Sequence, residues 1–210
     1  IKADDFEKVK GNLREIDKWI LSRFAKVKKE ATESLEEYEF SKALSAVRNF
    51  FWLEFADYYI EMVKHRVYDE EQETENGKAA KVVLVKIITE LLKMLAPFVP
   101  HIAEEIFQEN FKETAKKKSI HLEKWPLLDE KLINEKSEKA GEIAKEIIAG
   151  IRKYKSENNL SMNAELASVK VSFKEPELIE KVAEDIKATM KVKELKSEKT
   201  DSEELKIEAN

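Results

Sequence analysis

Glycine and proline are so scarce in this chain that long helices are the natural way for it to fold. Only 4 glycines and 4 prolines occur among 210 residues, whereas a β-rich fold needs such residues at its many turns. Apolar residues make up 42% of the sequence, which is enough for the core of one large or two small domains. We therefore expect a mainly α-helical protein.

Apolar residues at three- and four-residue spacing predict a succession of helices. The first is expected to begin at Asp17, a good N-cap residue, and to end near Tyr38. A second helix, apolar on most of its sides, is predicted from Ser41 to about Tyr68. Three more helices are predicted over about 78–95, 101–111 and 134–156, with an acidic loop over 69–77 and Pro100 at the start of the fourth helix.

The last fifty residues have a different pattern. Val169, Val171 and Phe173 alternate with polar residues, which predicts a half-buried strand. A helix opened by Pro176 should follow it. Shorter strands are predicted over 119–122, 192–196 and 205–208. We expect a helical bundle over residues 1–160 and a small α+β subdomain over residues 161–210.

Composition excludes several kinds of chemistry. The absence of cysteine rules out disulfides, thiol catalysis and cysteine-based zinc sites. No apolar run is long enough to cross a membrane, and no signal-peptide core precedes residue 10, so we expect a cytoplasmic protein. Glu54, Asp57 and Glu61 could suggest a carboxylate metal site, but no Glu-x-x-His pair accompanies them. We predict no catalytic, cofactor-binding or metal-binding residue. The isoleucine at position 1 suggests a piece of a longer protein.

The charge is distributed unevenly along the chain. The net charge is -5, which by itself argues against a nucleic-acid partner. Residues 8–29, however, contain eight basic and two acidic side chains, a local charge of +6. Trp19 lies off the apolar stripe of its helix, on a flank shared with Arg23 and Lys26. It could therefore stack on an unpaired base, or it could pack against a neighbouring helix.

A second basic cluster, Arg152, Lys153 and Lys155, ends the fifth predicted helix. Cations at this position could contact phosphates, but they also complement the helix dipole. The cluster alone therefore does not decide between a binding role and a structural one.

Three segments resemble the anticodon-binding domain of the class I aminoacyl-tRNA synthetases of the valine, isoleucine and leucine group. They are D-K-W-I-L-S-R over 17–23, L-A-P-F-V-P-H-I-A-E-E over 95–105, and S-I-H-L followed by W-P over 119–126. The segment F-W-L-E-F-A-D-Y-Y-I-E-M-V-K over 51–64 resembles the valine-specific enzymes, of archaeal type. The resemblance covers essentially the whole chain.

The resemblance implies tRNA recognition without chemistry, since the family's H-I-G-H and K-M-S-K-S motifs are absent from this sequence. It implies that Lys18 and Trp19 face the anticodon loop of valine tRNA, with the indole stacked on a base. The other implied tRNA contacts are Arg23, Lys26, Arg152 and Lys155 on phosphates, and Arg14 is added from its charge alone.

The same resemblance implies a longer parent enzyme that carries its own catalytic domain. That enzyme would join valine to tRNA with ATP and magnesium, as a monomer. Two alternatives stay open at this point: the corresponding domain of an isoleucine-specific enzyme, and a helical scaffold for protein interactions without a nucleic-acid role.

Overall fold

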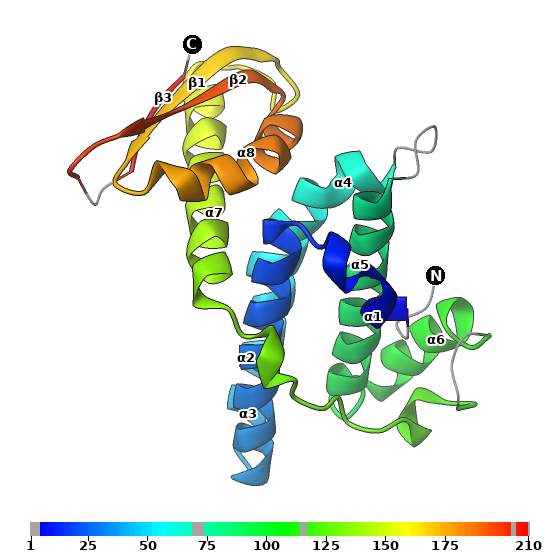
Figure 1. Ribbon diagram of the computed structural model, residues 1–210. Helices are drawn as coiled ribbons and strands as arrows, with labels where there is room; N and C mark the ends of the chain where they lie inside the picture. The colour runs from blue at the N-terminus through cyan, green and yellow to red at the C-terminus, as the bar shows by residue number, and fades with distance from the viewer. Residues whose placement is uncertain (1–4, 69–73, 114–116, 203–204, 210) are drawn as a thin grey trace.

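The computed structural model describes residues 5–68, 74–113, 117–202 and 205–209 (Figure 1). A bundle of helices is followed by a small sheet with one helix packed against it, which confirms the predicted mainly α fold with a small α+β part. The bundle helices are α1 (Phe6–Val9), α2 (Glu15–Glu36), α3 (Phe40–Phe50), α4 (Glu61–Val67), α5 (Glu75–Leu95), α6 (Pro100–Asn110) and α7 (Glu135–Glu157).

Helix α2 lies at the centre of the bundle and packs against both α3 and α7. It begins slightly earlier than predicted, because its N-cap is Arg14. Asp17 occupies the third helical position, where its carboxylate accepts a hydrogen bond from the backbone N–H of Arg14 at 2.9 Å. On the α3 side, the rings of Phe24 and Phe50 stack with their centroids 5.1 Å apart. Helix α2 therefore has more than one buried face.

The predicted long second helix is present and continuous. Helix α3 runs into a π-helical segment, Phe51–Ile60, and this segment runs into α4. The N-cap is Glu39 rather than Ser41. The turn that joins α2 to α3 contains Tyr38 with a φ of 62°, a left-handed conformation that bulky residues rarely adopt.

Two local predictions between α4 and α7 are wrong. Part of the predicted acidic loop belongs to α5, because Thr74 caps this helix by accepting a hydrogen bond from the N–H of Gly77 at 3.0 Å; residues 69–73 of that loop lie outside the described residues. The predicted strand over 119–122 is a turn of 3₁₀ helix, Ile120–Leu122. The backbone N–H of Ile120 donates to Glu104 on α6 at 3.0 Å, so this segment docks on a helix and joins no sheet.

The C-terminal unit matches its predicted elements closely. Its elements are β1 (Leu166–Phe173), α8 (Pro176–Met190), β2 (Val192–Lys199) and β3 (Lys206–Ala209). The sheet has the order β2-β1-β3, with β1 parallel to β2 and antiparallel to β3. Helix α8 packs against α4 and α7. Figure 1 shows α7 extending from the middle of the bundle to the sheet, so one helix belongs to both parts of the molecule.

Most buried apolar side chains of both parts form one continuous hydrophobic core, and a smaller cluster lies between α5, α6 and the segment around Ile120. Within the described residues, no helix has both the length and the apolar character needed to cross a membrane.

Candidate nucleic-acid interface

Two of the predicted phosphate-binding residues lie side by side where α2 meets α7. The guanidinium of Arg23 makes two hydrogen bonds to the carboxylate of Glu54, from Nε at 2.7 Å and from NH2 at 2.9 Å. The ammonium of Lys26 contacts Glu138 on α7 at 2.6 Å, and the same carboxylate lies 4.0 Å from Arg23. Both cations keep part of their side chain exposed, 32% for Arg23 and 41% for Lys26.

The ion pairs shift the pKa values of Arg23 and Glu138 toward the charged forms. The hydrogen bonds that Arg23 donates to Glu54 raise the pKa of Arg23 above its usual value, against the effect of burial. Burial alone would raise the pKa of Glu138, but hydrogen bonds from Lys26 and Ser22 outweigh it, and the pKa is lowered. The ion pairs therefore fix the directions of Arg23 and Lys26, while a guanidinium has further N–H groups to offer a phosphate.

Arg152 packs over the half-buried ring of Tyr58, four residues after Glu54 on the π-helical segment. Its guanidinium carbon is 5.1 Å from the ring centroid, and its NH2 donates to the backbone carbonyl of Asp57 at 3.1 Å. The ammonium of Lys145 lies 5.7 Å from the same ring. Cations over an aromatic face are held in place by the ring quadrupole without losing their charge.

Glu142 lies between the cations Arg23 and Lys26 and the cations Lys145 and Arg152. It forms an ion pair with Lys145 at 2.8 Å, and its charge also acts on Arg23. The four cations Arg23, Lys26, Lys145 and Arg152, supplied by α2 and α7, thus form one surface, called here the α2–α7 cationic surface. Lys145 was not predicted as a site residue; the sequence signal was its position seven residues before Arg152, on one face of a helix.

Lys18 and Arg14 do not belong to this surface. Lys18 is exposed, and its ammonium pairs only loosely with Glu15, at 3.8 Å. Arg14 contacts two carboxylates of α8, Glu184 at 3.0 Å and Asp185 at 3.4 Å. Arg14 therefore joins the first turn of α2 to the α+β unit.

Trp19 is not available to stack on a base, which corrects the prediction. Its side chain is fully buried, with 0% of its surface exposed. Its indole lies directly against Gly141 of α7, where an added Cβ would stand 2.1 Å from the indole Cγ. Among the described residues its Nε1 has no hydrogen-bond partner. Trp19 instead packs against a neighbouring helix, which was the alternative left open by the sequence.

Lys155 is not available to phosphates either, although it belongs to the predicted basic cluster. The side chain is 0% exposed, and its ammonium donates to three backbone carbonyls, those of Met162 at 3.0 Å, Ala164 at 2.7 Å and Met190 at 2.8 Å. Burial lowers its pKa. Lys155 therefore connects the end of α7 to the α+β unit.

The motif residue Asp17 is also structural. Its carboxylate accepts two hydrogen bonds from the guanidinium of Arg66, at 3.0 and 2.9 Å, and one from the hydroxyl of Tyr59 at 2.9 Å. Asp17 has no exposed surface and Arg66 very little. In a second motif, Glu104 accepts from the hydroxyl of Ser119 at 2.8 Å. The motif residues that identify the family at sequence level thus stabilise its fold.

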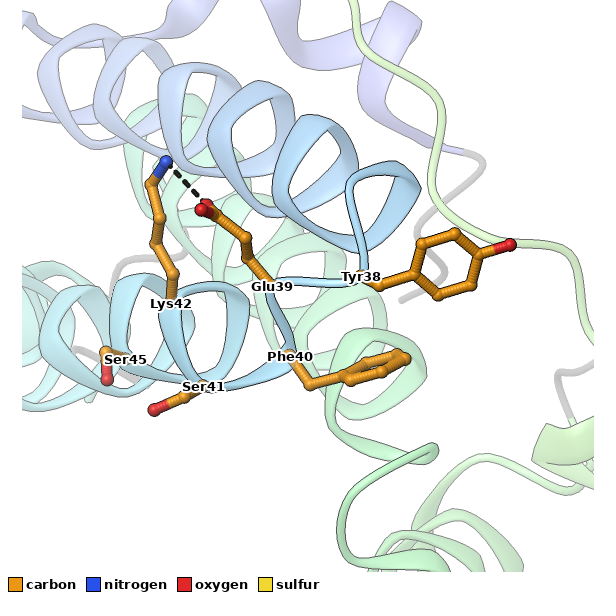
Figure 2. A pocket seen from close by; sticks show the side chains of 6 residues that line it. All are labelled: Tyr38, Glu39, Phe40, Ser41, Lys42 and Ser45. Atoms are coloured by element: carbon orange, nitrogen blue, oxygen red, sulfur yellow. Dashed lines mark hydrogen bonds and ion pairs between the residues drawn. The ribbon is translucent and has the colours of Figure 1, made fainter.

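Exposed aromatic rings at three places in the described residues were not predicted. Figure 2 shows the rings of Tyr38 and Phe40 projecting from the turn between α2 and α3, beside an ion pair of Lys42 with Glu39 at 2.9 Å. These rings are 80% and 54% exposed. Two further rings are exposed among the described residues: Trp52, 62% exposed on the π-helical segment, and Tyr68, 73% exposed at the end of α4. From the sequence alone, Trp52 is one of the apolar residues of the predicted helix over 41–68, and its exposure is not apparent.

The described residues contain no group of three or more acidic or histidine side chains arranged to hold a metal ion.

Comparison with known proteins identifies similar chains. The family model described as the anticodon-binding domain of tRNA ligase matches residues 17–172. The valine–tRNA ligase of Pyrococcus furiosus is 42% identical over 197 residues, covering 93% of this chain and 22% of that protein. The valine–tRNA ligase of Pyrococcus horikoshii is 43% identical over 200 residues, and that of Methanopyrus kandleri 39% over 201, each covering 93% of this chain. The chain spans about a fifth of the length of these relatives.

Proposed function

Because this chain belongs to the anticodon-binding domain family of tRNA ligases, we propose that it grips the anticodon stem and loop of valine tRNA through the α2–α7 cationic surface. The observation that carries the proposal is the convergence of Arg23, Lys26 and Arg152, from two separate helices, on one face. Phosphate oxygens could displace part of the carboxylate contacts and release counterions, which makes such binding strongly dependent on salt.

Lys18 extends the proposed contact toward the start of α2, where its exposed ammonium is free to meet a phosphate with little loss of ion pairing. Arg14 remains a peripheral candidate, since two carboxylates already compete for it. Trp19 and Lys155 have no part in the proposal, because both side chains are fully buried.

The valine specificity of the relatives supports a valine tRNA over an isoleucine tRNA as the partner, and the family match supports tRNA binding over a general protein scaffold. In this proposal the parent is a cytoplasmic, monomeric ligase. It joins valine to tRNA with ATP and magnesium, in a catalytic domain that lies elsewhere on the same chain. We also propose a division of this chain into a bundle, residues 1–160, and an α+β subdomain, residues 161–210.

A salt titration tests the tRNA contact. Binding of a valine tRNA transcript to the 210-residue chain is measured by filter retention across a series of salt concentrations. The logarithm of the affinity should fall linearly with the logarithm of the salt concentration. Replacement of Arg23, Lys26 or Arg152 by glutamine should each weaken binding and reduce the slope by about one.

The matched control is Lys153→Gln, on the same helix as Arg152 but 75% exposed and outside the cationic surface. It should leave the slope unchanged. Absence of binding at low salt, or equal slopes for the control and the three variants, would show that the cationic surface does not bind tRNA. An isoleucine tRNA that competes as well as valine tRNA would contradict the proposed specificity.

A further inference from the structure

Trp52 differs from the two other tryptophans of the chain in its surroundings. Trp19 is fully buried, and Trp125 is half-buried, with its Nε1 donating to the hydroxyl of Thr32 at 2.9 Å. Trp52 is 62% exposed, and the neighbouring Leu53 is 54% exposed. Large apolar side chains that stand together in solvent frequently mark a binding surface.

The π-helical segment explains why this ring faces outward. Phe50, Phe55 and Tyr59 are buried and form a continuous stack, with ring centroids 6.3 and 5.9 Å apart. The step of five residues from Phe50 to Phe55 matches the hydrogen-bond period of a π-helix, which keeps both rings on the core side. Trp52 lies between these positions along the chain and is left on the outer side. Such segments are rare and occur often at functional sites.

The side chains around Trp52 suit a nucleic acid. Arg48 and Asn49 precede the tryptophan by one helical turn, and both are exposed. Within the described part of the chain, neither side chain takes part in a hydrogen bond or an ion pair. Arg152 reaches the backbone of Asp57, five residues after Trp52, so the α2–α7 cationic surface adjoins this segment. Over residues 48–57 the exposed carboxylate is that of Asp57, whereas Glu54 is half-buried and paired with Arg23.

The other exposed aromatic pair lies in a different electrostatic setting. Tyr38 and Phe40 follow a stretch that includes Glu33, Glu36 and Glu37, and the nearby ammonium of Lys42 is already paired with Glu39. Carboxylates repel a phosphate backbone, which disfavours this pair as an RNA contact. Tyr68, 73% exposed at the end of α4, follows Lys64 and Arg66, whose charges are already paired with Glu61 and Asp17. Among the exposed rings of the described residues, we therefore favour Trp52, which lies one turn from an arginine without an ion pair.

We propose that Trp52 stacks on an unpaired base of the bound tRNA, with Arg48 contacting the adjoining phosphate. This inference rests on the proposed function, since it assigns one base contact to the same RNA. A flat indole offers a stacking surface to any base, while the free guanidinium of Arg48 fixes the backbone beside it. In this proposal Trp52, on the π-helical segment, makes the stacking contact that the buried Trp19 cannot make.

Intrinsic fluorescence provides the test. A valine tRNA transcript is titrated into the chain while tryptophan emission is recorded, because a stacked base quenches an indole. Trp52→Phe should abolish most of the quenching and retain most of the affinity, whereas Trp125→Phe should leave the quenching intact. Trp52→Ala should weaken binding about tenfold without changing the salt slope. Arg48→Gln should reduce the slope by about one.

The outcomes separate this inference from the function on which it rests. If the unmodified chain binds valine tRNA, but Trp52→Ala binds equally well and Trp52→Phe is still quenched, the stacking is wrong and the tRNA function stands. Trp52 would then be left as a contact for a protein. If the unmodified chain binds no tRNA at low salt, both proposals fail. Circular dichroism of each variant shows that a loss of affinity does not come from unfolding.

Discussion

The indole of Trp19 lies so close to Gly141 that no side chain fits between α2 and α7 at this point; a Cβ on the glycine would stand 2.1 Å from the indole Cγ. Trp19→Ala should therefore act on stability. Removing a fully buried aromatic side chain costs about 3–5 kcal/mol in free energy of unfolding. Urea unfolding followed by circular dichroism measures this. A variant as stable as the unmodified chain would contradict the packing described here.

Gly141→Ala tests the same contact from the other side. The methyl group would overlap the indole ring, which cannot give way because it is enclosed, so we expect a loss of about 1–3 kcal/mol or more. Gly150→Ala is the matched control on α7. Its added Cβ would meet only the terminal Cδ1 of Ile207, which can rotate aside. Alanine also favours helix over glycine, so the control should be neutral or slightly stabilising in the same unfolding assay.

The ion pair of Asp17 with Arg66 should be among the most costly polar contacts to break. Asp17→Asn removes the hydrogen-bonded charged partner of Arg66, whose side chain is 3% exposed, and leaves it the more distant carboxylate of Asp185 at 3.4 Å. Removing one member of a buried pair costs about 3–5 kcal/mol. Glu157→Gln, which breaks the exposed pair with Lys153, should cost less than about 1 kcal/mol. Thermal unfolding of the two variants should rank them clearly, and equal losses would contradict the assignment.

Asp185 should make stability depend on pH. Burial raises the pKa of this carboxyl from 3.8 to about 6, although Arg66 and Arg14 oppose the shift. Between pH 4 and 6 the folded chain then binds more protons than the unfolded chain, so the free energy of unfolding falls as the pH rises. The fall amounts to roughly 3 kcal/mol. Burial lowers the pKa of the neighbouring His65, which has the opposite effect and increases stability as the pH approaches 6.5.

Asp185→Asn isolates the contribution of this carboxyl. The difference in unfolding free energy between the unmodified chain and the variant, measured by urea unfolding at several pH values, should shift by about 3 kcal/mol from pH 4 to pH 7. Glu184→Gln is the control, since Glu184 also pairs with Arg14 but is 73% exposed. A constant difference for Asp185→Asn would show that the carboxyl titrates normally.

Lys155→Met should loosen the α+β unit without weakening phosphate binding. The variant removes the donor to three buried or partly buried carbonyls, an expected loss of roughly 2–4 kcal/mol. Hydrogen exchange should accelerate in β1 and α8 more than in α2 or α5. A folded variant with normal exchange and a salt slope for tRNA reduced by one would restore the phosphate role predicted from the sequence.

Helix and strand positions could be predicted because their periodicity is local. The strand at Val169 and Val171 and the helix opened by Pro176 lie where the pattern places them. The π-helical segment Phe51–Ile60 could not be predicted this way, because the same apolar sequence is compatible with an α-helix and with a π-helix. The two differ only in their backbone hydrogen bonds, which the periodicity of the side chains does not reveal. The exposure of Trp52 was missed for that reason.

The site residues were harder to predict, because a side chain outside the apolar stripe of its helix can still be buried by a helix far away in the sequence. A single apolar stripe describes one buried face, whereas α2 packs against both α3 and α7, and the second contact covers Trp19. Gly141, inside a helical pattern, was the available signal for a close approach. Lys155 resembles any cation at the end of a helix. Its partners are carbonyls on either side of β1, and no spacing rule connects them to α7.

Helix α7 also has a mechanical consequence. Its 23 residues form a rod about 35 Å long, seated on Trp19 near one end and tied by Lys155 at the other. A tilt of the sheet by about 5° would displace the far end of a rod of this length by about 3 Å. We therefore expect a displacement of the small C-terminal sheet to shift Gly141 and Glu138 against Trp19 and Lys26, and so to alter the proposed contact with RNA.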